Sequence, residues 1–314
     1  MAANVVNSWL AEAREALRRL EDSLAQRHGL CRIEVSLVPT EGAVTVGGHV
    51  LVDRLRAPVL AAVRRAAPDG WTVLDGMEVV QGGPWYALET ARVVYASASG
   101  GAVVTVLHPE DGPVERLGGV AGVSLVRDRC GTAAWLREPL GAPVEAPRLP
   151  RPSSRDPAAF LDAARSFEGT AYRLGGTDHD AIDCSGVVQR AAWGALRVAL
   201  PRNTGDLWGL GAQPGKPPAG RGHLVFVWTR GESLRHVGIV GEDMVVHASL
   251  SRRAVVSDPA QRFYAHAARI DHLPFEAILA LGERAAGKPN ILAAGVVLGR
   301  VESTASATVA DSGA

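Results

Sequence analysis

The sequence is poor in cysteine. Its 314 residues include only three, Cys31, Cys130 and Cys184, an odd number that is widely spaced along the chain. Such a set does not suit a disulfide framework, and it lacks the paired Cys/His spacing of a zinc site. We therefore expect a reducing compartment and neither a metal nor another cofactor. Cys31 and Cys130 are most simply explained as small buried apolar residues.

The chain also lacks an excess of charge and a long apolar run. Its 33 Lys and Arg residues balance 33 Asp and Glu residues, and no basic stripe with interleaved aromatic residues is present. These features exclude a strongly electrostatic nucleic-acid binder. No stretch has the length of a membrane span, and the N-terminus has no export-signal pattern. We expect a cytoplasmic protein that binds neither nucleic acid nor membrane; the sequence does not indicate its oligomeric state.

Length and composition predict more than one domain, since 314 residues with 47% hydrophobic residues exceed the usual single-domain size. Residues 1–82 begin with an amphipathic helix, Ser8 to Arg27, and continue as strand, strand, helix and strand, which resembles a BON-like module. Residues 83–140 hold short strand-like runs separated by Gly and Pro. The last of these runs, Gly131 to Leu136, resembles the final strand of a bacterial SH3-like barrel. The predicted segments are 31–38, 43–52, 55–66 and 71–80, then 91–96, 103–107, 123–127 and 133–137.

Two segments are predicted to lie outside the folded domains, one as a linker and one as a C-terminal tail. Residues 141–157 are rich in proline and predict a semi-rigid linker into a catalytic domain over residues 158–283. Residues 284–314 form a tail in which Ile291 to Val301 could add a strand, and Glu302 to Ala314 is expected to be disordered.

Cys184 lies where a nucleophile would be activated. Apolar residues recur at near-helical spacing after it, and Asp183 is a good N-cap type, so the sulfur is expected in the first turn of a helix. The helix dipole and a nearby imidazole would lower the thiol pKa from its ordinary value of about 8.5. The free N–H groups of the same turn could hold an oxyanion.

Two histidines follow on a predicted hairpin, His236 on the run 235–240 and His247 on the run 244–249. A two-residue loop at Gly241-Glu242 would place His236 opposite His247, with Cβ atoms roughly 5 Å apart. In that geometry His247 would orient His236, and His236 would face Cys184. A longer loop would shift this register, so the expectation that holds in either case is that the two residues lie on adjacent strands.

Six segments in order give the sequence a specific resemblance. They are 172–176 (YRLGG), 183–186 (DCSG), 200–202 (LPR), 222–226 (GHLVF), 236–240 (HVGIV) and 246–249 (VHAS). This series resembles the NlpC-type cell-wall cysteine peptidases over about residues 158–272. The resemblance implies an α+β, papain-like catalytic domain with Cys184, His236 and His247 as the catalytic triad. It also implies that the Tyr172 hydroxyl assists the Cys184 N–H in holding the oxyanion.

The sequence departs from the family pattern at two positions, Leu174 in place of Trp and His223 in place of Asp. We expect Leu174 to fill the same apolar slot. His223 could cap the loop before a core strand, or it could lie near the cleft and alter its charge.

The resemblance implies hydrolysis of the γ-D-glutamyl to diamino-acid bond of peptidoglycan stem peptides through an acyl-enzyme. Because no export signal is seen, we expect the substrate to be a small stem peptide in the cytoplasm and the role to be murein peptide recycling. An acyltransferase or amidase using the same thiol chemistry, and a non-catalytic cell-wall peptide binder, remain alternatives. A short substrate with several carboxylates calls for a closed cleft end and positive charge, although any one arginine could equally be a solvated surface residue. The candidate substrate-binding residues are Asp183, Ser185, Arg173, Arg202, Arg235, Trp85 and Tyr86.

Overall fold

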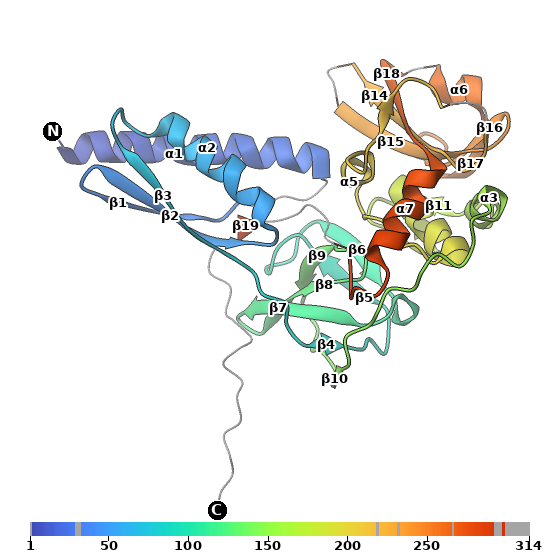
Figure 1. Ribbon diagram of the computed structural model, residues 1–314, viewed down its shortest axis with the longest axis horizontal. Coiled ribbons are helices and arrows are strands. Elements are labelled where there is room, and N and C mark those ends of the chain that lie inside the picture. The colour runs from blue at the N-terminus through green and yellow to red at the C-terminus, as the bar shows by residue number, and fades with distance from the viewer. Residues whose placement is uncertain are drawn as a thin grey trace, which may run out of the picture.

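The computed structural model describes residues 2–28, 33–217, 220–230, 233–265, 267–291 and 297–298. These residues form three β-sheets, and Figure 1 shows the first beside two helices and the third among the remaining helices. Among the described residues no helix has the length and apolarity that a membrane crossing needs.

The first sheet and its two helices match the predicted order of elements. Strand β2 pairs antiparallel with β1 and parallel with β3, and α2 makes the crossover between β2 and β3. Helix α1 buries Trp9, Ala13 and Leu17 at four-residue spacing, which gives it one apolar face toward this core. A strand was also expected within residues 291–301, and β19 pairs there with β2. The elements are α1 (Ala2–His28), β1 (Ser36–Thr40), β2 (Ala43–Val50), α2 (Arg56–Ala66), β3 (Thr72–Val79) and β19 (Val297–Leu298).

The second sheet has its strands in the order β10-β4-β7-β8-β9-β5-β6. The described pairings run as an open path, so the predicted closure into an SH3-like barrel is not confirmed. Strand β7 was not predicted, because Gly118 and Gly119 interrupt its apolar pattern near an irregularity in the pairing. The strands are β4 (Trp85–Tyr86), β5 (Arg92–Tyr95), β6 (Val103–Leu107), β7 (Val114–Val120), β8 (Val123–Arg127), β9 (Ala133–Leu136) and β10 (Pro143–Val144).

The third sheet has the order β12-β11-β17-β16-β15-β14-β18-β13, and helix α4 packs against β15 and β16. Apolar residues of α4, including Val187 and Val188, share one buried core with Phe226 and Ile239 of the sheet. Its elements are α3 (Pro157–Arg165), β11 (Ala171–Tyr172), β12 (Ala181–Ile182), α4 (Cys184–Ala191), α5 (Thr204–Trp208), β13 (Gln213–Pro214), β14 (Leu224–Thr229), β15 (Ser233–Val240), β16 (Met244–Ser249), β17 (Ala254–Pro259), α6 (Ala260–Tyr264), β18 (Arg269–Leu273) and α7 (Phe275–Ala285).

The proline-rich segment 141–157 is hydrogen-bonded at several points. Its residues Pro143–Val144 form β10 and pair with β4 of the second sheet, and later residues bond other parts of the chain. The N–H of Leu149 donates to the carbonyl of Lys288 at 2.7 Å, and its own carbonyl accepts from Gly287 at 2.9 Å. Further on, Ser153 N–H donates to the Leu196 carbonyl at 2.8 Å. These bonds and the β10 pairing connect the segment predicted as a linker to its neighbours in the chain.

The upstream parts of the chain contact the third sheet and its helices directly. Helix α1 packs against α5 and β15, and Figure 1 shows the end of α1 remote from the N-terminus lying near α5. The second sheet contributes Thr105, whose hydroxyl accepts from Arg202 Nε at 3.2 Å, and Val106, whose carbonyl accepts from the Thr177 hydroxyl at 2.9 Å. The surroundings of α4 therefore include residues of the second sheet as well as residues of the third sheet and its helices.

Candidate active site

Cys184 is the first residue of α4, and Asp183 is its N-cap. Asp183 Oδ1 accepts from the Gly186 N–H at 2.8 Å, and Oδ2 accepts from the Gly175 N–H at 2.8 Å. The predicted N-cap is confirmed. This cap satisfies N–H groups that have no partner within the helix, and it fixes where the chain enters the first turn.

A buried ion pair holds the capping carboxylate. Arg202 donates through Nη1 to Asp183 Oδ1 at 2.8 Å and through Nη2 to Oδ2 at 2.6 Å, and its residue is 3% exposed. Burial alone would raise the pKa of Asp183, but the Arg202 guanidinium and the N–H donors outweigh it and hold that pKa below its ordinary value.

Ser185 belongs to the same cluster, because its hydroxyl donates to Asp183 Oδ1 at 3.2 Å and accepts from Arg202 Nη1 at 2.9 Å. We expected these three residues to contact substrate. They are instead buried and bonded to one another, so Arg202 does not offer its charge to a solute.

The thiol of Cys184 is buried, at 8% exposure for the residue. Its sulfur lies 3.8 Å from the Thr204 hydroxyl on α5 and receives the Val237 N–H of β15. Burial, followed by the negative charge of Asp183, raises the pKa of Cys184 to about 11, although Thr204, Val237 and Arg202 act in the opposite direction. The expected lowering of this pKa is therefore wrong, because packing against α5 and β15 removes the water that would stabilise a thiolate.

The two histidines meet through their rings. His236 Nε2 lies 2.8 Å from His247 Nδ1, with the ring planes nearly perpendicular at 84°. The predicted register is wrong by two residues, because β15 and β16 pair Val240 with Val245 and not with Asp243. In this register His236 and His247 are diagonal neighbours on the same face, which long side chains can still bridge.

Asp258 on β17 extends the pair. Its Oδ2 lies 3.3 Å from His247 Nε2, and its Oδ1 accepts from Arg252 Nη2 at 2.9 Å. Phe263 of α6 lies against both rings, with centroids 5.6 Å from His236 and 4.8 Å from His247. Sequence reasoning missed Asp258 and Phe263. The sequence signal for Asp258 was a polar residue in a strand next to the His247 strand. Many strands carry a polar residue, so this signal does not identify a site residue.

His236 is a neutral imidazole in this setting. Burial, and next the neighbouring His247, lower the pKa of His236 to about 3, while Asp183 acts to raise it. Cys184 therefore rests as a buried thiol and His236 as a neutral imidazole, which is able to accept a proton.

Tyr172 lies on β11, and its N–H donates to the Arg253 carbonyl at 2.8 Å. Burial, and next the negative charges on Cys184 and Asp183, raise the pKa of Tyr172 to about 12. Tyr172 is partly buried and packs against the apolar cluster that contains Cys184. The hydroxyl keeps its proton, which leaves it available as a donor.

The two departures from the family pattern have separate outcomes. Leu174 is 76% exposed, so the expectation that it fills an apolar slot is wrong. The ring of His223 is buried directly before β14 and packs edge-on against His272 of β18, with centroids 6.3 Å apart. Its Nδ1 has no hydrogen-bond partner within the described part of the chain, so the side chain does not cap the loop through that atom.

Of the four remaining candidates, the structure describes the side chains of three. Arg173 is exposed beside Tyr172, and the side chain of Arg235 falls outside the described residues. Trp85 and Tyr86 form β4 of the second sheet, where Trp85 is 5% exposed and packs inside its own domain. Cys130 is buried as expected, whereas Cys31 is outside the described residues. No cluster of three or more His, Cys, Asp or Glu residues suited to a metal occurs in the described ranges.

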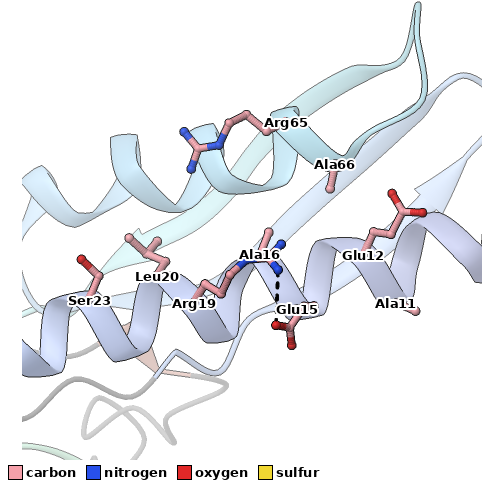
Figure 2. Close-up of a pocket in the computed structure, with 9 residues that line it drawn as sticks. All are labelled: Ala11, Glu12, Glu15, Ala16, Arg19, Leu20, Ser23, Arg65 and Ala66. Atoms are coloured by element: carbon pink, nitrogen blue, oxygen red, sulfur yellow. Dashed lines mark hydrogen bonds and ion pairs between the residues drawn. The ribbon is translucent and has the colours of Figure 1, made fainter.

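A separate groove lies between α1 and α2, with an empty volume of about 1240 Å³ that includes open solvent. Figure 2 shows Arg65 and Ala66 of α2 above the polar face of α1, where Arg19 pairs with Glu15 at 3.4 Å. None of the predicted site residues lines this groove.

The thiol at a helix N-terminus, the histidine pair and the nearby phenol are chemically able to perform nucleophilic acyl transfer. The family model described as the NlpC/P60 family matches residues 169–271, which include all of these groups. A probable endopeptidase of Haemophilus influenzae is 34% identical over 112 residues, which are 35% of this chain and 70% of that protein. The chain belongs to the NlpC/P60 family.

Two further comparisons concern the same region. The protein named murein DD-endopeptidase MepS/murein LD-carboxypeptidase of Escherichia coli K12 is 34% identical over 106 residues, which are 33% of this chain and 56% of that protein. The chain thus spans about half the length of this relative. The solved NlpC/p60 domain of peptidoglycan hydrolase SagA has a TM-score of 0.33 and 24% identity, covering 38% of this chain and 98% of that chain.

Proposed function

We propose that this chain is a cysteine endopeptidase that hydrolyses the γ-D-glutamyl to diamino-acid bond of peptidoglycan stem peptides. The observation that carries the proposal is the group formed by Cys184 at the start of α4 and His236 with its 2.8 Å contact to His247. Membership of the NlpC/P60 family supports the peptidase activity, since its relatives are named as murein or probable endopeptidases.

The resting protonation states define the first step. The Nε2 atom of His236 is engaged by His247, so Nδ1 is the nitrogen left to accept the thiol proton. The sulfur attacks the amide carbon as this proton moves, and the resulting imidazolium then protonates the leaving amine. Water hydrolyses the acyl-thioester, with His236 acting as base again. The Tyr172 hydroxyl and the Cys184 N–H donate to the oxyanion in both halves of the reaction.

The substrate in this proposal is a short stem peptide with a free amine, handled during murein peptide recycling in the cytoplasm. Contacts of the upstream parts of the chain support a site that is closed at one end, since α1 packs on α5 and Thr105 bonds Arg202. The exposed Arg173 beside Tyr172 supplies positive charge for a substrate carboxylate.

The test is product analysis by mass spectrometry on defined substrates. The full-length protein is offered the tripeptide L-Ala-γ-D-Glu-diaminopimelate, its N-acetylated form, a tetrapeptide ending in D-Ala, a cross-linked dimer and insoluble peptidoglycan, with Cys184→Ala as the blank. We expect free diaminopimelate from the tripeptide and little reaction with the N-acetylated form. Release of terminal D-Ala, or conversion of the dimer to monomers, would assign the bond specificity named for the Escherichia coli relative. Preference for insoluble wall would refute the recycling role.

A further inference from the structure

We propose that Asp258 is a positioning residue that sets the direction of hydrogen bonding through the histidine pair, so that the basic nitrogen of His236 faces Cys184. This inference deepens the proposed function and rests on it for the role of His236 in catalysis. The hydrogen-bond direction itself is a property of the resting protein and can be measured without a substrate.

The ionised carboxylate of Asp258 only accepts hydrogen bonds. His247 Nε2 lies 3.3 Å from Asp258 Oδ2, so this nitrogen must carry the hydrogen. A neutral imidazole has one N–H, and therefore His247 Nδ1 is an acceptor. Burial lowers the pKa of His247 more than Asp258 raises it, which keeps the ring neutral.

The hydrogen bond between the two rings fixes the tautomer of His236 in the same way. His236 Nε2 lies 2.8 Å from His247 Nδ1, and because that Nδ1 accepts, His236 Nε2 must donate. His236 is also neutral, so its Nδ1 has a free lone pair. This lone pair can accept the thiol proton. The tautomer of His236 is thus set by Asp258, which acts through the side chain of His247.

Without an acceptor at Asp258 the pair has a second arrangement with the same number of hydrogen bonds between the rings. In that arrangement His247 Nδ1 donates to His236 Nε2, and the hydrogen of His236 moves to Nδ1. His236 Nδ1 would then be a donor and could not accept the thiol proton. A chain of two imidazoles cannot choose between these arrangements alone, so an acceptor at its end is required.

The position of Asp258 is itself fixed. On the backbone it pairs with Val245 across β16 and β17, and Oδ1 receives Arg252 at 2.9 Å with Arg262 Nε at 3.9 Å. Because the two guanidinium groups lie on Oδ1, Oδ2 is the atom left for His247. Three other charged groups act on Asp258 and the two histidines. They are Arg252 from the β16–β17 turn, Arg262 from α6 and Asp183 from the start of α4.

The test compares Asp258→Asn with Asp258→Glu in the full-length protein. The Asn amide can donate to His247 Nε2 and would reverse the direction of the hydrogen bond between His247 and His236. The Glu carboxylate would still accept from His247 Nε2. Ring-nitrogen NMR on protein labelled with ¹⁵N-histidine reports the tautomers, and variants at His236 and His247 assign the signals. We expect hydrogen on Nε2 of both rings in the parent protein and in Asp258→Glu, and hydrogen on Nδ1 of His236 in Asp258→Asn.

Kinetics on the cleaved stem peptide give the second readout. We expect Asp258→Asn to lower kcat by about 10²- to 10⁴-fold with little change in KM, as for loss of the correct tautomer of a catalytic histidine. Asp258→Glu should recover part of kcat. The matched control is Glu242→Gln, the same chemical change on the exposed turn where Glu242 pairs with Arg221.

The outcomes separate this inference from the proposed function. A fall in kcat with unchanged tautomers in folded Asp258→Asn would overturn the positioning role and assign Asp258 to stability. Unchanged kcat together with unchanged tautomers would overturn it as well. If the tautomers reverse as expected while no stem peptide is cleaved by the parent protein, the positioning role stands and the proposed function fails.

Discussion

The resting state of Cys184, the proposed nucleophile, gives the sharpest prediction. Burial raises the pKa of Cys184 to about 11, and the ordinary value for a free thiol is about 8.5. At about 1.36 kcal/mol per pKa unit, the buried thiolate is disfavoured by roughly 3 kcal/mol. At pH 7 the thiolate fraction is then on the order of 10⁻⁴, and the reaction with iodoacetamide should be about 10²-fold slower than that of an exposed cysteine.

The assay follows alkylation of the Cys184 peptide by mass spectrometry between about pH 6 and pH 9. Because the thiolate fraction rises tenfold per pH unit below the pKa, the alkylation rate should rise with the same slope. Cys130 is an internal reference: it is 2% exposed and burial raises its pKa to about 12, so it should react more slowly. His236→Gln should leave the slope unchanged, because a neutral imidazole contributes no charge to the resting thiol.

A different resting state would show clearly. If Cys184 and His236 formed a thiolate–imidazolium pair, alkylation would be fast and nearly independent of pH over this range, and His236→Gln would slow it. The ultraviolet absorbance of the thiolate would also be present at neutral pH. That result would refute the argument that burial by α5 and β15 dominates the helix N-terminus and the neighbouring imidazole.

Three other variants test the remaining parts of the site. Tyr172→Phe should lower kcat by about 10²- to 10³-fold with KM little changed, and a change confined to KM would make the phenol a binding group. In the same steady-state assay His236→Ala should abolish turnover, and His247→Gln should cost less because an amide can replace an orienting ring; the reverse order would exchange their roles. Arg202→Met should lower the free energy of unfolding in urea by about 3–5 kcal/mol, because it leaves Asp183 buried without its partner. The pKa of Asp183 is depressed in the folded protein, so its pairing stabilises above the unfolded pKa of about 4 and the difference should shrink as pH falls below that value; a pH-independent difference would assign the loss to packing.

The sequence predicted those elements whose apolar periodicity is strong. The runs 235–240 and 244–249 correspond to β15 and β16, and the helix after Asp183 begins at Cys184. The hairpin register was not predictable in the same way, because a two-residue loop can lie at 241–242, as predicted, or at 242–243, as the pairing of Val240 with Val245 requires. The structure closes the turn by a bond from the Gly241 N–H to the Met244 carbonyl at 2.8 Å, and this moves the pairing by two residues.

Tertiary properties of the site were beyond the sequence. Asp258 reaches His247 only because β16 pairs with β17, where His247 lies opposite Val256. The sign of the Cys184 pKa shift likewise depends on how closely α5 and β15 cover the sulfur, which local sequence does not determine. The helix N-terminus was predicted correctly from residues 183–186, but burial outweighs the groups that lower the pKa of Cys184.

The second sheet is linked to the nucleophile through a short series of bonds. The hydroxyl of Thr105 accepts from Arg202, Arg202 binds both oxygens of Asp183, and Asp183 caps the helix that starts at Cys184. Arg190 of the same helix pairs with Asp111, so the second sheet is attached to α4 at two points. Because such buried charges are costly to leave unpaired, removing the upstream residues would disturb the cap as well as expose a surface. The geometry of the nucleophile therefore depends on a part of the chain that lies outside the segment shared with its relatives.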